Sequence, residues 1–467
     1  MTTLFRCLSL VLGPSIASLV GLANSSIAAP LPDRPPETLL KKSVRVVDAD
    51  GKPVAGATLD PWAIQAEQFG QRPWRPPGFP PTITTDSDGM AKITYPRLVD
   101  PVRKIPPTSV ICRLNHPDYA ETFQMLGIDL SDKNDNVATL ILPRGVQVEV
   151  TATSDDKALP VEHVYAAWND GGLGTPNRRK ISADGRLQLP RFLPGPKDLL
   201  VAYVPTEGPI LFSEFERTEL KNDEKRGLRV TLKPGVIVSG RLDDRVPRPV
   251  KNGRMVGQVI SRLNADWRDS ATIKEDGSFT LGPFPHGDLQ VIALCDGYIA
   301  QSGVAPEFVP EARRAQGGYN RPQVFPLTKE KVELTLLMTP TVDCHVRVLD
   351  SEGHPAAGAK CWGNPNVGWW NGGSQGYCDR LYSSLERLTQ PNLKFDSSKD
   401  RLFFAETDAD GRAVIKNLPP TEKGIALYYD GMNRFVRISL KPGSQNKVIV
   451  KLPPKGSKAP VSTEVLQ

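Results

Sequence analysis

The sequence has few of the residues on which most enzymes and nucleic-acid-binding proteins rely. It holds only five histidines in 467 residues, and none stands in the His-Glu-x-x-His arrangement of a zinc peptidase. Basic and acidic residues nearly balance, 58 against 52, and no basic run is interleaved with aromatic residues. We therefore expect no catalytic residues, no metal, no cofactor and no nucleic-acid partner.

Two short motifs resemble functional sites but lack parts that the chemistry needs. Residues 372–376 read GGSQG, like a nucleophile elbow, yet no histidine follows residue 354 to complete a triad in that chain order. Residues 48–51, 86–89 and 408–411 resemble the start of a calcium loop, but the glycine comes too early and the closing glutamate is missing. We interpret the glycines as loop residues and the aspartates as hairpin turn residues.

Long hydrophobic runs are also missing, except near the N-terminus. A short positively charged start is followed by an apolar stretch over residues 7–23, and the small residues Ser26 and Ala28 come next. This order is typical of a secretory signal peptide, here residues 1–28. A transmembrane anchor is the alternative, although the stretch is shorter than the ~20 residues that span a bilayer. We expect export to the periplasm, cell surface or medium, without membrane insertion of the mature chain.

Proline (44) and glycine (39) are plentiful, and they separate short runs of alternating apolar and polar residues. Residues 44–57 read VRVVDADGKPVAGA, and residues 346–359 read VRVLDSEGHPAAGA. Each is an alternating run, an acidic glycine turn and an entry into a second strand, which is the pattern of a hairpin. Weaker copies at 146–164 and 236–250 keep the alternating strand, the acidic turn and the proline.

A second element, Asp-Gly before another alternating run, follows each copy. The aspartates stand at 88, 184, 276 and 410, so the repeat is about 90 to 100 residues long and the last copy holds an insertion. This predicts an all-β chain, a tandem array of four small antiparallel β-sandwiches. The expected map is: signal peptide 1–28, linker 29–40, repeats 41–143, 144–233, 234–340 and 341–453 with an insertion at about 361–405, and a disordered tail 454–467.

The paired GKPVAGA and TDADGRAVI elements, with their spacing and closing strands, resemble the carboxypeptidase regulatory-like domain, a transthyretin-like or prealbumin-like sandwich. The resemblance covers nearly all of the mature chain and is strongest in the first and fourth copies. It implies a non-catalytic module that folds beside other domains or in arrays on bacterial exported proteins. The family carries no catalytic residues, so the resemblance transfers no site.

Five cysteines remain once the signal peptide is removed, so at least one thiol is left without an intramolecular partner. We predict a disulfide between Cys361 and Cys378, because the two residues bracket the insertion in the fourth copy. Pairing of Cys344 with Cys361 is the alternative, since both side chains have inward parity on the strands of one hairpin.

The insertion concentrates aromatic residues in a glycine- and asparagine-rich setting. Trp362, Trp369, Trp370 and Tyr377 form the candidate ligand site, because recognition usually lies on loops held by a rigid scaffold. The alternative is that these rings pack as a lid over their own sandwich. We expect a structural spacer or adhesion module with a protein or cell-wall polysaccharide partner; a carbohydrate-binding array that uses these aromatics is the alternative function.

Overall fold

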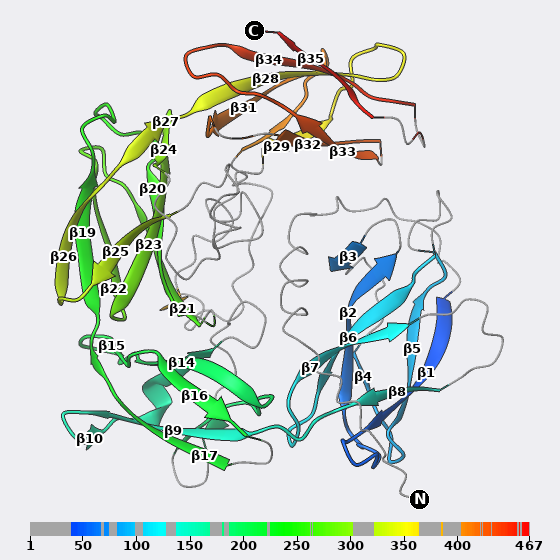
Figure 1. Cartoon of the computed structure of the whole chain (residues 1–467), viewed down its shortest axis with the longest axis vertical. Coiled ribbons are helices and arrows are strands. Elements are labelled where there is room, and N and C mark those ends of the chain that lie inside the picture. Colours follow the sequence, from blue (N-terminus) through cyan, green and yellow to red (C-terminus); the bar gives the residue numbers. More distant parts are fainter. Residues whose placement is uncertain are drawn as a thin grey trace, which may run out of the picture.

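The computed structural model is almost entirely β-structure, which confirms the expected all-β fold (Figure 1). It describes residues 39–466 except 67–69, 74–81, 99–105, 128–136, 169–179, 182–185, 222–224, 302–321, 364–383, 386–402 and the short gaps at 262, 264, 421, 423, 431, 455–456 and 458–459. Its sheets form four successive pairs, here called the first to fourth units. Within the described residues, no helix has the length and apolarity needed to span a bilayer.

The first unit pairs the sheet β5-β1-β8 with the sheet β3-β2-β6-β7, and β4 adds to β2. The strands are β1 (Leu39–Val47), β2 (Thr58–Ala66), β3 (Gly70–Pro73), β4 (Ile83–Thr84), β5 (Met90–Pro96), β6 (Ser109–Asn115), β7 (Thr122–Gly127) and β8 (Ala138–Ile141). The second unit consists of two sheets. In the first, of order β10-β9-β13-β12, β17 also pairs with β9; in the second, of order β11-β14-β15-β18, β16 also pairs with β14.

The strands of the second unit are short at its rim and long in its centre. They are β9 (Gln147–Ser154), β10 (Lys157–Ala158), β11 (Val164–Trp168), β12 (Lys180–Ile181), β13 (Leu187–Gln188), β14 (Gly195–Tyr203), β15 (Leu211–Phe212), β16 (Glu216–Leu220), β17 (Lys225–Thr231) and β18 (Lys233–Pro234). A short 3-10 helix, η2 (Val161–His163), precedes β11.

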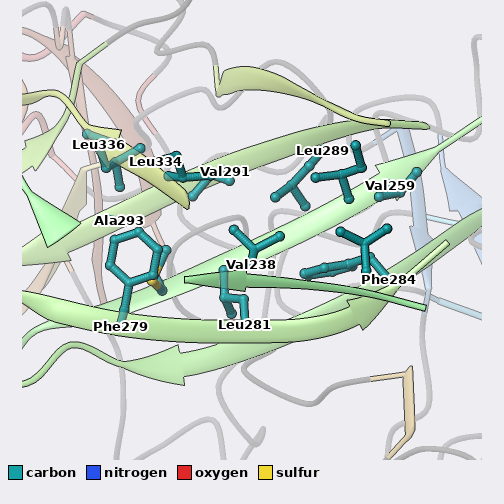
Figure 2. Close-up of a cluster of buried hydrophobic side chains, with 14 of the residues drawn as sticks. Val238, Val259, Phe279, Leu281, Phe284, Leu289, Val291, Ala293, Leu334 and Leu336 are labelled. Carbon is teal, nitrogen blue, oxygen red and sulfur yellow. The ribbon is translucent and has the colours of Figure 1, made fainter. Parts of the chain in front are cut away.

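The third unit pairs β22-β19-β26 with the longer sheet β21-β20-β23-β24-β27, to which β25 adds. Its strands are β19 (Val236–Leu242), β20 (Arg254–Ile260), β21 (Asp266–Thr272), β22 (Ser278–Phe284), β23 (Gly287–Cys295), β24 (Tyr298–Ala300), β25 (Gln323–Leu327), β26 (Lys331–Leu336) and β27 (Met338–Pro340). Figure 2 shows its core, where residues such as Val238 and Leu281 from one sheet meet Leu289 and Val291 from the other.

The fourth unit pairs β31-β28-β34-β35 with β30-β29-β32-β33. Its strands are β28 (Val342–Leu349), β29 (Lys360–Gly363), β30 (Phe404–Glu406), β31 (Arg412–Leu418), β32 (Gly424–Tyr429), β33 (Met432–Arg437), β34 (Asn446–Lys451) and β35 (Ser462–Leu466). We expected residues 454–467 to be a disordered tail, but β35 pairs antiparallel with β34, because the free edge of β34 offers backbone partners to an extended segment.

The units share one topology, which explains why their sequences repeat. In each, the first strand pairs antiparallel with the strand after the Asp-Gly turn and parallel with the closing strand: β1 with β5 and β8, β9 with β13 and β17, β19 with β22 and β26, and β28 with β31 and β34. We expected antiparallel sandwiches, but each unit also contains one parallel strand pair. The chain crosses to the other sheet before each closing strand, and such a crossover permits a parallel pair.

Neighbouring units are coupled to different extents. The buried apolar residues of the first unit form a cluster of their own, within residues 44–142. The core of the third unit, in contrast, includes Ala167, Leu200 and Phe212 of the second unit. Val256 and Ile292 of the third unit belong in turn to the core of the fourth. The domain boundaries near 143, 234 and 340 stay predictions. The second unit has a core of its own within residues 146–232, while the cores of the third and fourth units extend onto the preceding unit.

One aromatic contact joins the second and third units. The ring of Phe212, on β15, meets the ring of Trp267, on β21, edge to face with centroids 4.8 Å apart. Trp267 also donates a hydrogen bond from Nε1 to the carbonyl oxygen of Pro283 (3.1 Å), which fixes its orientation. A backbone amide of the third unit, that of Leu263, donates to the Asp198 carboxylate of the second unit (3.0 Å).

We predict that Phe212→Ala lowers the free energy of unfolding by about 3 kcal/mol, because it leaves a cavity under Trp267 in a core shared by two units. Calorimetry measures the loss and shows whether the second and third units then unfold separately. Met125→Ala is the control: this side chain is 54% exposed, so the change stays within about 0.5 kcal/mol. A loss at Phe212 no larger than the control's would contradict the coupling.

Candidate functional site

In the acidic turns that recur in the sequence, an aspartate side chain accepts hydrogen bonds from backbone amides of the same turn. The carboxylate of Asp48 accepts hydrogen bonds from the amides of Asp50 and Lys52, two and four residues later. The same two bonds recur at Asp86, Asp350 and Asp408, and all eight donor–acceptor distances lie between 2.8 and 3.0 Å. The interpretation of these aspartates as turn residues is confirmed.

The glycines of the Asp-Gly pairs at 88–89 and 410–411 have a steric reason. Gly89 and Gly411 both have φ of +71°, a conformation that disfavours a side chain. A Cβ at Gly89 would lie 2.4 Å from the carbonyl oxygen of Val46, and one at Gly411 would lie 2.4 Å from that of Val348. In the first and fourth units, the Asp-Gly signature therefore marks the point where the turn crosses the first strand.

These amide donors also set the charge state of the aspartates. The amide of Lys52, followed by that of Asp50, lowers the pKa of Asp48 below its ordinary value, and Arg144 adds to the effect. Burial opposes ionisation of Asp350, but the amides of His354 and Glu352 outweigh it and hold that pKa below its ordinary value too. The folded chain thus prefers both carboxylates ionised.

The structure changes the candidate aromatic site. Trp362 does not lie on a loop: it is a half-buried residue of β29, paired with Phe404 of β30 and Ala426 of β32. The strand continues through it because its neighbours Cys361 and Gly363 both face inward. Trp369, Trp370 and Tyr377 lie outside the described residues. The insertion expected at about 361–405 is therefore shorter, since its first and last residues belong to β29 and β30.

The cysteines of the described residues are buried. Cys112, Cys295, Cys344 and Cys361 are free thiols, and burial raises the pKa of Cys361, assisted by nearby Cys344, to about 12. Burial likewise raises the pKa of Cys344 to about 12. Cys344 and Cys361 share the core of the fourth unit, as their parity predicts, and both are protonated at neutral pH.

The predicted disulfide has only one partner within the described residues. Cys361 is a free thiol there, and Cys378 lies outside them. The Cys361–Cys378 pairing therefore stays a prediction. Residues 372–376, with the nucleophile-elbow pattern, lie outside the described residues as well. Where side chains are described, no three or more His, Cys, Asp or Glu residues gather in a group that could hold a metal ion.

Sequence reasoning missed a buried polar cluster on the outer face of the third unit. Asp266 and Arg268, both 5% exposed, form an ion pair on β21. Gln258, on the neighbouring β20, donates a hydrogen bond from Nε2 to Asp266 (2.8 Å). The backbone amide of Arg268 donates to the hydroxyl of Ser384 (2.9 Å), which lies 116 residues away in the insertion of the fourth unit.

A hydrogen bond next to this cluster, from the Arg268 amide to Ser384, joins the third unit to the insertion of the fourth. A buried ion pair is costly to break, because removal of one partner leaves an uncompensated charge. The hydrogen bond from the Arg268 amide to Ser384 is a separate contact, and it attaches the fourth unit to the third in addition to the apolar contacts between them. In the sequence, the only signal for this cluster was that Asp266 and Arg268 stand two residues apart and therefore share one face of a strand.

Comparisons with known proteins give no family assignment. No protein-family model matches the chain, and no curated protein matches it either. Among solved structures, a streptococcal ancillary pilin is similar at 9% identity and a TM-score of 0.23, covering 66% of this chain and 100% of that one. The minor pilin of Streptococcus agalactiae is similar at 11% identity and a TM-score of 0.22, covering 48% and 99%.

A third solved structure, the major pilin subunit of Bacillus cereus, is similar at 9% identity and a TM-score of 0.16, covering 65% of this chain and 100% of that one. Likeness at this level assigns neither a function nor a family to the chain.

We predict that the Asp48 turn loses its stabilising effect in acid. Because the folded pKa lies below the unfolded one, the stabilisation is present above about pH 4 and is lost as the pH falls through the folded pKa. Asp48→Ala should therefore lower the unfolding temperature by about 2–4 °C at pH 7 and by much less in strong acid. Asp88→Ala, an exposed aspartate of another turn, is the control with little effect. An equal loss at both pH values would contradict the prediction.

Proposed function

We propose that the chain is a non-catalytic exported protein of carboxypeptidase regulatory-like repeats, with domain boundaries near 143, 234 and 340. It acts as a structural spacer or binding module at the cell surface or in the periplasm. The observation that carries the proposal is that the cores of the third and fourth units each extend onto residues of the preceding unit, which joins the second, third and fourth units. Joined cores hold the units in fixed relative positions, which a spacer or a presenting scaffold needs and independent modules on linkers lack.

The burial pattern also limits where a partner can bind. The inner faces of the sheets form the cores, and the outer face of the β20–β23 pair is covered in part by the core of the fourth unit through Val256, Ile292 and Leu294. Loops, strand edges and the exposed outer faces of other sheets, such as that of β28 and β31, remain for recognition. The partner that we propose is a protein or a cell-wall polysaccharide.

Export is the first part of the proposal to test. We predict that cells carrying the full chain release it from the cytoplasm with a new N-terminus next to Ala28, because small residues there precede Pro30. Cell fractionation and the intact mass of the recovered protein measure this. A variant with Leu10→Arg interrupts the apolar stretch and should stay in the cytoplasm. Recovery of wild-type protein that still begins at Met1 would overturn the export claim.

The ligand site of the insertion remains part of the proposal through Trp369, Trp370 and Tyr377. If these rings are presented to a partner, Trp369→Ala combined with Trp370→Ala weakens binding to cell-wall glycan or protein by about tenfold and leaves stability unchanged. Binding assays and thermal unfolding separate the two effects. Trp362→Ala is the contrasting control, because this half-buried strand residue should affect stability first. Lower stability with unaltered binding would contradict the ligand site and would favour the alternative, in which the rings pack over their own sandwich.

A further inference from the structure

The four closing strands occupy equivalent places, yet their outer edges differ. Three of them are protected against pairing with another chain. On β17, the exposed residues include Lys225, Arg226 and Arg229. On β26, Lys331 and Glu333 are exposed. The edge of β34 is covered, since β35 pairs with it from Lys447 to Lys451. Charge and a covering strand are the two common ways in which proteins block sheet edges.

Among the described residues, the closing strand of the first unit, β8, has neither protection. Its sequence is ATLI, without a charged residue, and it is the last strand of the sheet β5-β1-β8. Val137 just before it is 48% exposed, and Ile141 at its end is 52% exposed. An uncharged apolar edge of this kind is a template for strand pairing.

The adjacent rim of the same sandwich is uncharged too. There β7, with the sequence TFQMLG, is the last strand of the second sheet, and its Met125 is 54% exposed. The edge strand at the matching place of the second unit, β16, carries Glu216, Arg217 and Glu219 instead. Both β7 and β8 therefore lack charged residues.

The backbone of β8 is already oriented for an outside partner. The side chain of Gln124, on β7, accepts a hydrogen bond from the amide of Ile141 (3.2 Å) and donates one to its carbonyl oxygen. The polar groups of Ile141 thus point away from β1, and those of Thr139, two residues earlier, point the same way. Gln124 takes the place that a neighbouring strand would fill at this one residue.

We propose that two copies of this chain associate through β8, which pairs antiparallel with β8 of the second copy about a two-fold axis. The fourth unit shows that a closing strand of this fold accepts an antiparallel neighbour, as β34 accepts β35. Pairing β8 with itself brings no like charges together, whereas the same pairing of β17 would oppose its lysine and arginines. The exposed Val137 and Ile141 of both copies become covered.

The association needs Gln124 to release Ile141, so the glutamine limits its strength. Two hydrogen bonds per copy are exchanged for bonds to the partner strand, and only a short strand is paired. The dimer is therefore weak and depends on protein concentration. The inference does not rest on the proposed function: a strictly monomeric chain would leave the spacer proposal standing, and retention in the cytoplasm would leave the edge pairing standing.

Sedimentation velocity over a wide range of concentration, with the purified chain, tests the proposal. We expect a concentration-dependent dimer that Ile141→Lys abolishes, because a lysine on the edge strand blocks pairing and the two-fold axis brings two such positive charges into one short interface. Thr139→Lys, at an exposed position of the same strand, should act alike and covers the case in which the first variant fails to fold. Val414→Lys is the matched control: Val414 is an exposed residue of another edge strand, β31, and its change should leave the dimer intact.

A second variant probes the role of the glutamine. Gln124→Ala removes the competing side chain and should tighten association by about tenfold. If wild type is monomeric and Gln124→Ala dimerises, and adding Ile141→Lys reverses this, the edge pairing is supported. Monomers for both wild type and Gln124→Ala would overturn it, as would a dimer that persists in both lysine variants.

Discussion

Burial of one sheet on both of its faces is the constraint on which the arrangement of the chain depends. Strand β23 is buried along nearly its whole length, from Leu289 to Cys295. Leu289 and Val291 face the core of the third unit, while Ile292 and Leu294 face the core of the fourth. Because the apolar area of one strand stabilises two sandwiches, the third unit cannot separate from the fourth without exposing it to water. The contact of Phe212 with Trp267 extends the same dependence to the second unit.

The features predicted from the sequence are those decided by neighbours in the chain. The Asp-Gly turns could be predicted because the carboxylate bonds amides two and four residues away, and the glycine adopts its positive φ locally. The strands beside them could be predicted from alternation, as at Cys344, Val346 and Val348, which all face inward on β28. Local chemistry of this kind repeats wherever the sequence repeats.

The remaining features depend on residues far apart in the sequence. The bond between Arg268 and Ser384 and the strand β35 each need a partner that no local pattern identifies. Trp362 was assigned to a loop because glycine and asparagine follow it, whereas the inward-facing Cys361 and Gly363 extend the strand through it. The run VIALC in β23 did carry a signal, since continuous apolar residues in a strand indicate burial on both faces.

The parallel pairing of first and closing strands has a mechanical consequence. In the first unit the chain enters at the start of β1 and leaves at the end of β8, and these two strands lie side by side in the same direction. Tension applied along the chain therefore pulls the two strands past each other and loads their hydrogen bonds together, in shear, rather than opening them one after another. The same geometry recurs with β9 and β17, β19 and β26, and β28 and β34. Each unit is built to resist stretching between its two ends.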